Sequence, residues 1–283
     1  MNNQNKSDWI NQVTGNSAPL FFIMGPCALE SESHTLKIAE FLKKLSEKLG
    51  FRFVFKGSYD KANRTSLGNA RGLGIEKGLQ VLAKVRTEFD VPVITDVHET
   101  WQIEPVAAAV DIIQIPAFLC RQTDLLLAAG NTGKVVHIKK GQFLMPEIME
   151  KVVKKVESTG NKKIWLCERG FSFGYDRYVV DYRGFPIMKE TGCPVIFDVT
   201  HSVQRPNCIA GASGGERQFV PPLAIAATSL GIAGIFMEVH DNPEKALSDG
   251  PNSIKLTELE PLLHHLIELD AWTKSRVFPQ VSE

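Results

Sequence analysis

The segment at residues 56–66 carries the side chains that are best suited to bind an anion. It reads Lys-Gly-Ser-Tyr-Asp-Lys-Ala-Asn-Arg-Thr-Ser and follows residues 51–55, an apolar run with the length and composition of a buried strand. Arg64 can hold a phosphate through two parallel hydrogen bonds, and Lys56 and Lys61 add positive charge. A run of charged residues more often forms a solvent-exposed basic loop. Donors packed this closely against an apolar strand instead favour a site for a phosphorylated or carboxylated metabolite.

A regular succession of short apolar runs indicates which elements position this segment. Strands that alternate with helices are typical of βαβ units and of a parallel sheet buried on both faces. Eight repeats within 283 residues predict an α/β fold, a (β/α)8 TIM barrel in a single domain. A doubly wound open sheet is the alternative, but its dinucleotide fingerprint is missing from the sequence. The predicted strands are residues 20–24, 51–55, 92–95, 111–115, 135–138, 163–166, 194–197 and 233–237, and the predicted helices are residues 33–49, 74–89, 99–109, 146–157, 185–190 and 222–230.

Polar and ionisable residues follow the carboxyl end of every predicted strand, where barrels of this kind build their active sites. Cys27 follows the first strand, His201 the seventh and Glu238 the eighth, with Asp249 in the loop beyond. A closed barrel brings the first and eighth strands together, so these four side chains should meet. A lone cysteine is more often a small packing residue. In a closed barrel, however, the four together could bind a divalent metal such as Zn, Fe, Mn or Co.

A second grouping at the predicted barrel mouth is cationic. Lys56 and Lys61 follow the second predicted strand, Lys139 the fifth and Arg169 the sixth. Four positive charges on one wall predict a ligand with more than one negative charge.

Composition limits the classes of partner and the setting. The chain has 32 basic and 32 acidic residues, and zero net charge argues against a general affinity for nucleic acid or anionic membranes. Five cysteines without CxxC spacing fit a reduced cytoplasmic setting. The uncharged stretch at residues 218–237 is interrupted by prolines and glycines, so it is predicted to form a helix and a buried strand rather than a membrane span. We expect a polar N-terminal extension at residues 1–19, the barrel at residues 20–275 and a short tail at residues 276–283.

From about residue 23 to residue 252 the chain resembles the 3-deoxy-D-manno-octulosonate 8-phosphate synthase family. The motifs that carry the resemblance lie at residues 25–31, 56–66, 95–99, 114–124, 139–142, 197–204 and 246–250. The resemblance implies a (β/α)8 barrel that assembles as a homotetramer. It also implies a transferase that condenses phosphoenolpyruvate with D-arabinose 5-phosphate, releasing inorganic phosphate, on the route to lipopolysaccharide.

The resemblance also assigns roles to particular residues. The family has metal-dependent and metal-independent members, and Cys27 and Ser248 resemble the metal-dependent group. The implied metal ligands are Cys27, His201, Glu238 and Asp249. The implied residues for phosphoenolpyruvate are Lys139 and Arg169 at its phosphate, Lys56 and Lys61 at its carboxylate, and Gln114 and Ala117 lining the pocket. The implied residues for the pentose phosphate are Asn63, Arg64, Thr65 and Asp96, with Arg121 contributed from a neighbouring subunit. Ser213, in the small-residue segment 202–216 expected to close over the site, is a further candidate for binding substrate.

The chemistry that follows is a hypothesis. The enol carbon C3 of phosphoenolpyruvate attacks the aldehyde C1 of the open-chain pentose phosphate, water adds at C2, and phosphate leaves by C–O cleavage. A metal could polarise the aldehyde or activate the water. The candidate catalytic residues are Asp249, His201, Lys61 and Asn63.

Three alternatives remain open at this point. The sister synthase that uses erythrose 4-phosphate shares the barrel, but its sugar-phosphate loop typically reads Lys-Pro-Arg-Thr where this chain has Lys-Ala-Asn-Arg-Thr. An aldolase could form a Schiff base through Lys56 or Lys139, although both lie among donors to anions. A barrel that binds metal or phosphate without catalysis is the third.

Overall fold

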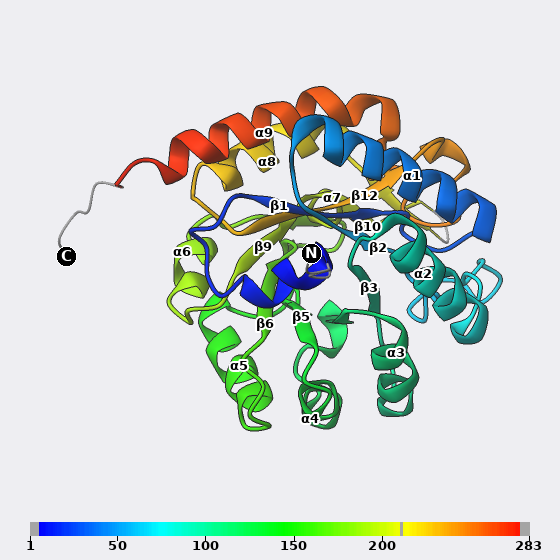
Figure 1. Cartoon of the computed structure of the whole chain (residues 1–283), viewed down its shortest axis with the longest axis horizontal. Helices are drawn as coiled ribbons and strands as arrows, with labels where there is room; N and C mark the ends of the chain where they lie inside the picture. Colours follow the sequence, from blue (N-terminus) through cyan, green and yellow to red (C-terminus); the bar gives the residue numbers. More distant parts are fainter. Residues whose placement is uncertain (1–5, 210–211, 278–283) are drawn as a thin grey trace, which may run out of the picture.

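Parallel strands close into a barrel surrounded by helices (Figure 1). The computed structural model describes residues 6–209 and 212–277. Within these residues, β1 pairs with β2 on one side and with β12 on the other, which closes the ring. The predicted (β/α)8 barrel is therefore confirmed. The strands of the ring are β1 (Phe21–Gly25), β2 (Phe53–Lys56), β3 (Val93–Asp96), β4 (Ile112–Ile115), β5 (Val135–Lys139), β6 (Ile164–Glu168), β9 (Val195–Asp198) and β12 (Gly234–His240).

Both faces of the ring are buried, which explains why the strands read as continuous apolar runs. Alternate residues such as Ile23, Val54 and Phe236 fill the interior. Their neighbours, such as Phe22 and Phe55, pack against the outer helices. The larger helices are α1 (Glu32–Leu49), α2 (Ile75–Phe89), α3 (Ile103–Ala109), α4 (Thr123–Asn131), α5 (Met149–Glu157), α6 (Gly184–Lys189), α8 (Val220–Thr228) and α9 (Leu259–Lys274).

Smaller elements decorate the carboxyl ends of the strands. The short helix α7 (Val199–Ser202) follows β9 directly. An antiparallel hairpin of β7 (Phe171–Phe173) and β8 (Arg177–Val179) follows β6. A second antiparallel hairpin, of β10 (Gln204–Ile209) and β11 (Ala212–Gly215), follows α7. The strand β13 (Ile254–Lys255) pairs with the end of β12. Short 3₁₀ helices within the loops are η2 (Thr100–Gln102), η3 (Ala117–Leu119), η4 (Pro146–Ile148), η5 (Arg217–Phe219), η6 (Pro243–Lys245) and η7 (Leu256–Glu258).

A 3₁₀ helix near the N-terminus, η1 (Lys6–Gln12), lies over the middle of the barrel in Figure 1. Its side chains Trp9 and Ile10, together with Val13, join the apolar cluster that fills the barrel interior. The ring of Trp9 meets the edge of Phe21 at 5.4 Å between centroids. The stretch expected to be a polar extension therefore contributes apolar contacts that cover the amino-terminal end of the strands.

Gly25 ends β1 at the level of Glu238 on β12. A Cβ atom on Gly25 would lie 1.8 Å from the carbonyl oxygen of Lys56, so only glycine allows the backbones of β1 and β2 to approach this closely. This approach brings the segment that carries Cys27 next to the end of β12. Within the described residues, no helix is long and apolar enough to cross a membrane.

Candidate active site

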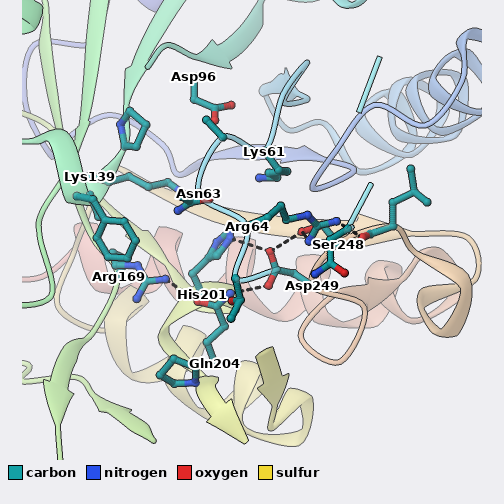
Figure 2. Close-up of a pocket in the computed structure, with 18 of the residues that line it drawn as sticks. Lys61, Asn63, Arg64, Asp96, Lys139, Arg169, His201, Gln204, Ser248 and Asp249 are labelled. Carbon is teal, nitrogen blue, oxygen red and sulfur yellow. Dashed lines mark hydrogen bonds and ion pairs between the residues drawn. The ribbon is translucent and has the colours of Figure 1, made fainter. Parts of the chain in front are cut away.

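A cavity of about 960 Å³ opens at the carboxyl ends of the strands (Figure 2). Residues from the predicted set that line it are Lys61, Asn63, Arg64, Thr65, Asp96, Gln114, Ala117, Lys139, Arg169, His201 and Asp249. Cys27 and Glu238 are buried next to it without lining it. Arg121 is exposed and does not contribute to the cavity lining. Ser213 lies in β11, and its side chain is outside the described part of the structure.

The four predicted metal ligands lie together. Ligand atoms of Cys27, His201 and Glu238 are within 4.8 Å of one another. Asp249 joins them, because Sγ of Cys27 donates to its Oδ2 at 2.9 Å and Nε2 of His201 lies 3.7 Å from the same oxygen. Oε2 of Glu238 is buried and has no hydrogen-bond partner among the described residues. A thiol, an imidazole and two carboxylates with a spare buried oxygen fit a divalent transition metal.

Asp198, which sequence reasoning left without a role, supports this group. Its Oδ2 lies 2.8 Å from Nδ1 of His201, which turns Nε2 of His201 toward Glu238 and Asp249, each 3.7 Å away. Burial acts to lower the pKa of His201, but the negative charge of Asp198, together with hydrogen bonds to Asp198 and Asp249, raises that pKa to about 10. Carboxylates that hold metal-binding histidines in this way are common. The signal in the sequence was an aspartate three residues before a histidine at a strand end.

Lys56 lies beneath the ligand group and outside the cavity lining. Its Nζ donates to Oε1 of Glu238 at 2.6 Å and to the carbonyl oxygen of Cys27 at 2.8 Å. The side chain is completely buried. In this structure Lys56 therefore neutralises Glu238, whereas the other three members of the predicted cationic wall face the cavity.

Lys61, Lys139 and Arg169 supply positive charge to the cavity. Burial acts to lower the pKa of Lys61, but the negative groups around it, including Asp249, raise that pKa above its usual range. Nζ of Lys139 donates to Oδ2 of Asp198 at 2.6 Å. Arg169 lies over the ring of Tyr178, and its Nη1 is buried without a hydrogen-bond partner in the described part of the chain. A guanidinium with a free, desolvated donor is suited to a phosphate oxygen.

The segment after β2 docks on the loop that carries Asp249. Arg64 donates to Oγ of Ser248 at 3.0 Å and to the carbonyl oxygen of Leu247. Its neighbours Asn63 and Thr65 are exposed at the rim of the cavity. Figure 2 shows the side chain of Arg64 beside Ser248 and Asp249, on the other side of the view from Arg169.

Asp96 and His98 form an ion pair at the cavity wall, with Nε2 of His98 3.0 Å from Oδ2 of Asp96. Burial acts to raise the pKa of Asp96, but His98 and Lys61 lower it below its usual range, so the carboxylate is ionised. Its Oδ1 has no hydrogen-bond partner among the residues described. That oxygen can accept a hydrogen bond from a hydroxyl group in the cavity.

A second group of potential ligands, formed by Glu30, His34 and His240, is a hydrogen-bond network. The backbone N–H of Asn242 donates to Nδ1 of His240 at 2.9 Å, so the ring proton lies on Nε2 and is donated to Oε1 of Glu30 at 3.1 Å. The same glutamate oxygen accepts the backbone N–H of Leu247 at 3.0 Å. The network thus ties the start of α1 to the loop that follows β12.

Comparison with known proteins finds a matching family and similar named proteins. The model of the DAHP synthetase I family matches residues 2–275. A protein of Bartonella quintana is 53% identical over 264 residues, which cover 93% of this chain and 95% of that protein. A protein of Synechococcus is 54% identical over 255 residues, 90% of each chain. One of Coxiella burnetii is 54% identical over 268 residues, 95% of this chain and 96% of that protein. Each of these three is named 2-dehydro-3-deoxyphosphooctonate aldolase.

Proposed function

The chain belongs to the DAHP synthetase I family and, within it, to the 2-dehydro-3-deoxyphosphooctonate aldolases, and from this premise we propose how its active site works. The reaction is the condensation of phosphoenolpyruvate with D-arabinose 5-phosphate and water, which gives 3-deoxy-D-manno-octulosonate 8-phosphate and inorganic phosphate. The observation that carries this function is the name shared by relatives that are 53–54% identical over most of the chain. It favours the pentose phosphate over erythrose 4-phosphate.

Two anionic substrates fit the distribution of charge in the cavity. Arg169 and Lys139 bind the phosphate of phosphoenolpyruvate, and the free Nη1 of Arg169 supports this assignment. Asn63, Arg64 and Thr65 bind the phosphate of the pentose at the opposite rim. Holding both substrates between these groups aligns the reacting carbons and offsets the repulsion between two phosphates.

The ligand group Cys27, His201, Glu238 and Asp249 would hold a divalent transition metal. The spare buried oxygen of Glu238 and the 2.9 Å contact of Cys27 with Asp249 support this proposal. When bound, such a metal supplies Lewis acidity for the aldehyde oxygen or for the water. The identity of the metal is left open among Zn, Fe, Mn and Co, since the donor set accepts each of them.

The protein groups then serve each step of the condensation. As C3 of phosphoenolpyruvate forms its bond to C1 of the aldehyde, Lys61 donates a proton to the aldehyde oxygen, because its raised pKa keeps it protonated. Asp96 accepts a hydrogen bond from a pentose hydroxyl through its free Oδ1. Water adds at C2, and the carboxylate of Asp249 is placed to take the proton that it loses. His201 lies 3.7 Å from that carboxylate and holds its orientation. The C2–O bond to phosphate then breaks while the C2 hydroxyl gives up its proton to the departing phosphate, which leaves the ketone of the product and inorganic phosphate.

The assembly and setting of the protein are further parts of the proposal. Arg121 is exposed away from the cavity, and the apolar side chains Phe118 and Phe143 near the mouth are more than half exposed. A homotetramer that covers this surface would bring Arg121 of one subunit to the pentose phosphate of the next. The four cysteines whose side chains the structure describes are buried and unpaired, which supports a reduced cytoplasmic setting.

The test is phosphate release from phosphoenolpyruvate with each aldose phosphate in turn, before and after chelation. We expect release with D-arabinose 5-phosphate, little with erythrose 4-phosphate, and loss of activity on chelation that is reversed by added metal. Cys27→Ala should be inactive with metal, whereas Cys193→Ala, which removes another buried thiol before β9, should respond as the wild type does. Full activity of Cys27→Ala after chelation would refute the metal proposal.

A further inference from the structure

Gln204 connects the arginine of one phosphate site to a proposed metal ligand. It is the first residue of β10, and its side chain lies between Arg169 and Asp249 (Figure 2). Nη2 of Arg169 donates to Oε1 of Gln204 at 2.7 Å. Nε2 of Gln204 donates to Oδ1 of Asp249 at 2.5 Å. The carbonyl thus faces the cation and the amino group faces the anion, an arrangement that a neutral amide can make in one orientation only.

Each of these bonds occupies one atom of a charged group and leaves the group's second nitrogen or oxygen for another contact. Because Nη2 of Arg169 is engaged by Gln204, the buried Nη1 is left without a partner among the described residues and is available to an anion. Because Oδ1 of Asp249 is engaged by Gln204, Oδ2 is turned to Cys27 and lies 3.7 Å from His201. One side chain therefore orients the donor for the phosphate and the oxygen for the metal.

We propose that Gln204 is a positioning residue that couples binding of phosphoenolpyruvate at Arg169 to binding of the metal at Asp249. The inference rests on the proposed function, because it takes the phosphate and metal assignments as given. Binding of either ligand fixes one end of the Gln204 amide. The second ligand then binds at a smaller cost in conformational entropy, because the Gln204 side chain is already fixed. Each ligand therefore raises the affinity for the other, and by the same factor.

A second connection to Asp249 provides an internal comparison. Oδ2 of Asp249 accepts a hydrogen bond from Oγ of Ser248 at 3.1 Å, and Ser248 in turn accepts one from Arg64 at 3.0 Å. This path leads to the proposed pentose-phosphate side of the cavity. With phosphoenolpyruvate as the only substrate present, coupling should depend on Gln204 and should survive Ser248→Ala.

The experiment measures Co²⁺ affinity by competition with a chelator, with and without phosphoenolpyruvate and in the absence of pentose phosphate. For the wild-type protein we expect phosphoenolpyruvate to tighten Co²⁺ binding by ~5-fold or more, and Co²⁺ to tighten phosphoenolpyruvate binding by the same factor. Gln204→Met keeps the shape of the side chain and removes both hydrogen bonds, so this ratio should fall close to one while both ligands still bind. Gln142→Met is the matched control, because Gln142 also lines the cavity but contacts Tyr178 rather than Asp249.

The outcomes separate this inference from the proposed function. A wild-type ratio of one, or an unchanged ratio in Gln204→Met, overturns the role of Gln204 and leaves the proposed reaction and metal intact. Loss of coupling in Gln142→Met as well would also overturn it, because the effect would then be general to the cavity. Failure of the wild-type protein to bind Co²⁺ would overturn the metal proposal and the coupling with it.

Discussion

Nζ of Lys56 lies 2.6 Å from Oε1 of Glu238 inside the barrel, and both side chains are excluded from solvent. Removing one partner of a buried ion pair leaves an uncompensated charge, which typically costs about 3–5 kcal/mol. We therefore expect Lys56→Met to lower the free energy of unfolding by about this amount, measured as a shift of the urea midpoint.

An exposed pair of the same length provides the control. Nζ of Lys48 also lies 2.6 Å from a carboxylate oxygen, that of Glu260, but both side chains are solvated. Exposed pairs contribute little to stability, so Lys48→Met should hardly change the midpoint. Equal shifts of the urea midpoint in the two variants would show that burial of the Lys56–Glu238 pair does not increase its contribution to stability.

Asp198→Asn should weaken metal binding while leaving all four proposed ligands in place. The substitution removes the charge that raises the pKa of His201 and that holds the orientation of its ring. Loss of such a supporting carboxylate typically lowers metal affinity about 10–100-fold. Competition with a chelator at fixed pH measures this change. Asp241→Asn is the control, since Asp241 contacts His34 rather than His201; an equal loss in both variants would contradict the role of Asp198.

The sequence was sufficient to predict the ring of strands, because each strand is buried on both faces and so reads as an uninterrupted apolar run. Each of the eight predicted runs overlaps a strand of the ring, with ends within a few residues of those observed. The hairpin of β7 and β8 was not predicted. Each of its strands is only three residues long and its side chains are mostly exposed, so no buried apolar run marks it as sheet.

The candidate site was predicted as a set of residues but not as a set of contacts. Strand order was enough to bring Cys27, His201 and Glu238 together. It did not reveal that Lys56 pairs with Glu238 beneath the cavity or that Gln204 bridges two charged residues. Such pairings depend on the direction of side chains in the folded barrel, which neither residue type nor spacing encodes. The roles assigned to these residues in binding and catalysis stay predictions.

His137 should make the protein sensitive to acid. It is completely buried beside the ring of Phe236, and neither ring nitrogen has a hydrogen-bond partner in the described structure. Burial lowers its pKa from 6.5 to about 3. Below pH 6.5 the unfolded chain takes up a proton that the folded protein does not, so stability from this group falls as the pH falls toward 3.

The comparison of His137→Leu with the wild type isolates this group, because other acid-sensitive groups are the same in both. At pH 7 the variant should be at least as stable, since two unsatisfied buried nitrogens are removed. Below about pH 6.5 its advantage should grow by about 1.4 kcal/mol per pH unit, measured from urea midpoints at each pH. A difference that does not change with pH would mean that His137 titrates normally in the folded protein.

Trp9 should stabilise the barrel from the end opposite the cavity. Its ring is 9% exposed, packs on Phe21 at 5.4 Å and lies under the guanidinium of Arg52. Truncation of a buried tryptophan typically costs about 3–5 kcal/mol, so Trp9→Ala should lower the urea midpoint strongly. Trp272→Ala should have a small effect, because that ring is 60% exposed on α9.

Since η1 contacts the amino-terminal ends of the strands, affinity for phosphoenolpyruvate should be unchanged in folded Trp9→Ala. If the fully folded variant bound phosphoenolpyruvate more weakly, η1 would influence the cavity through the barrel interior. If the urea midpoint of Trp9→Ala did not change, Trp9 would not cover the barrel end in solution.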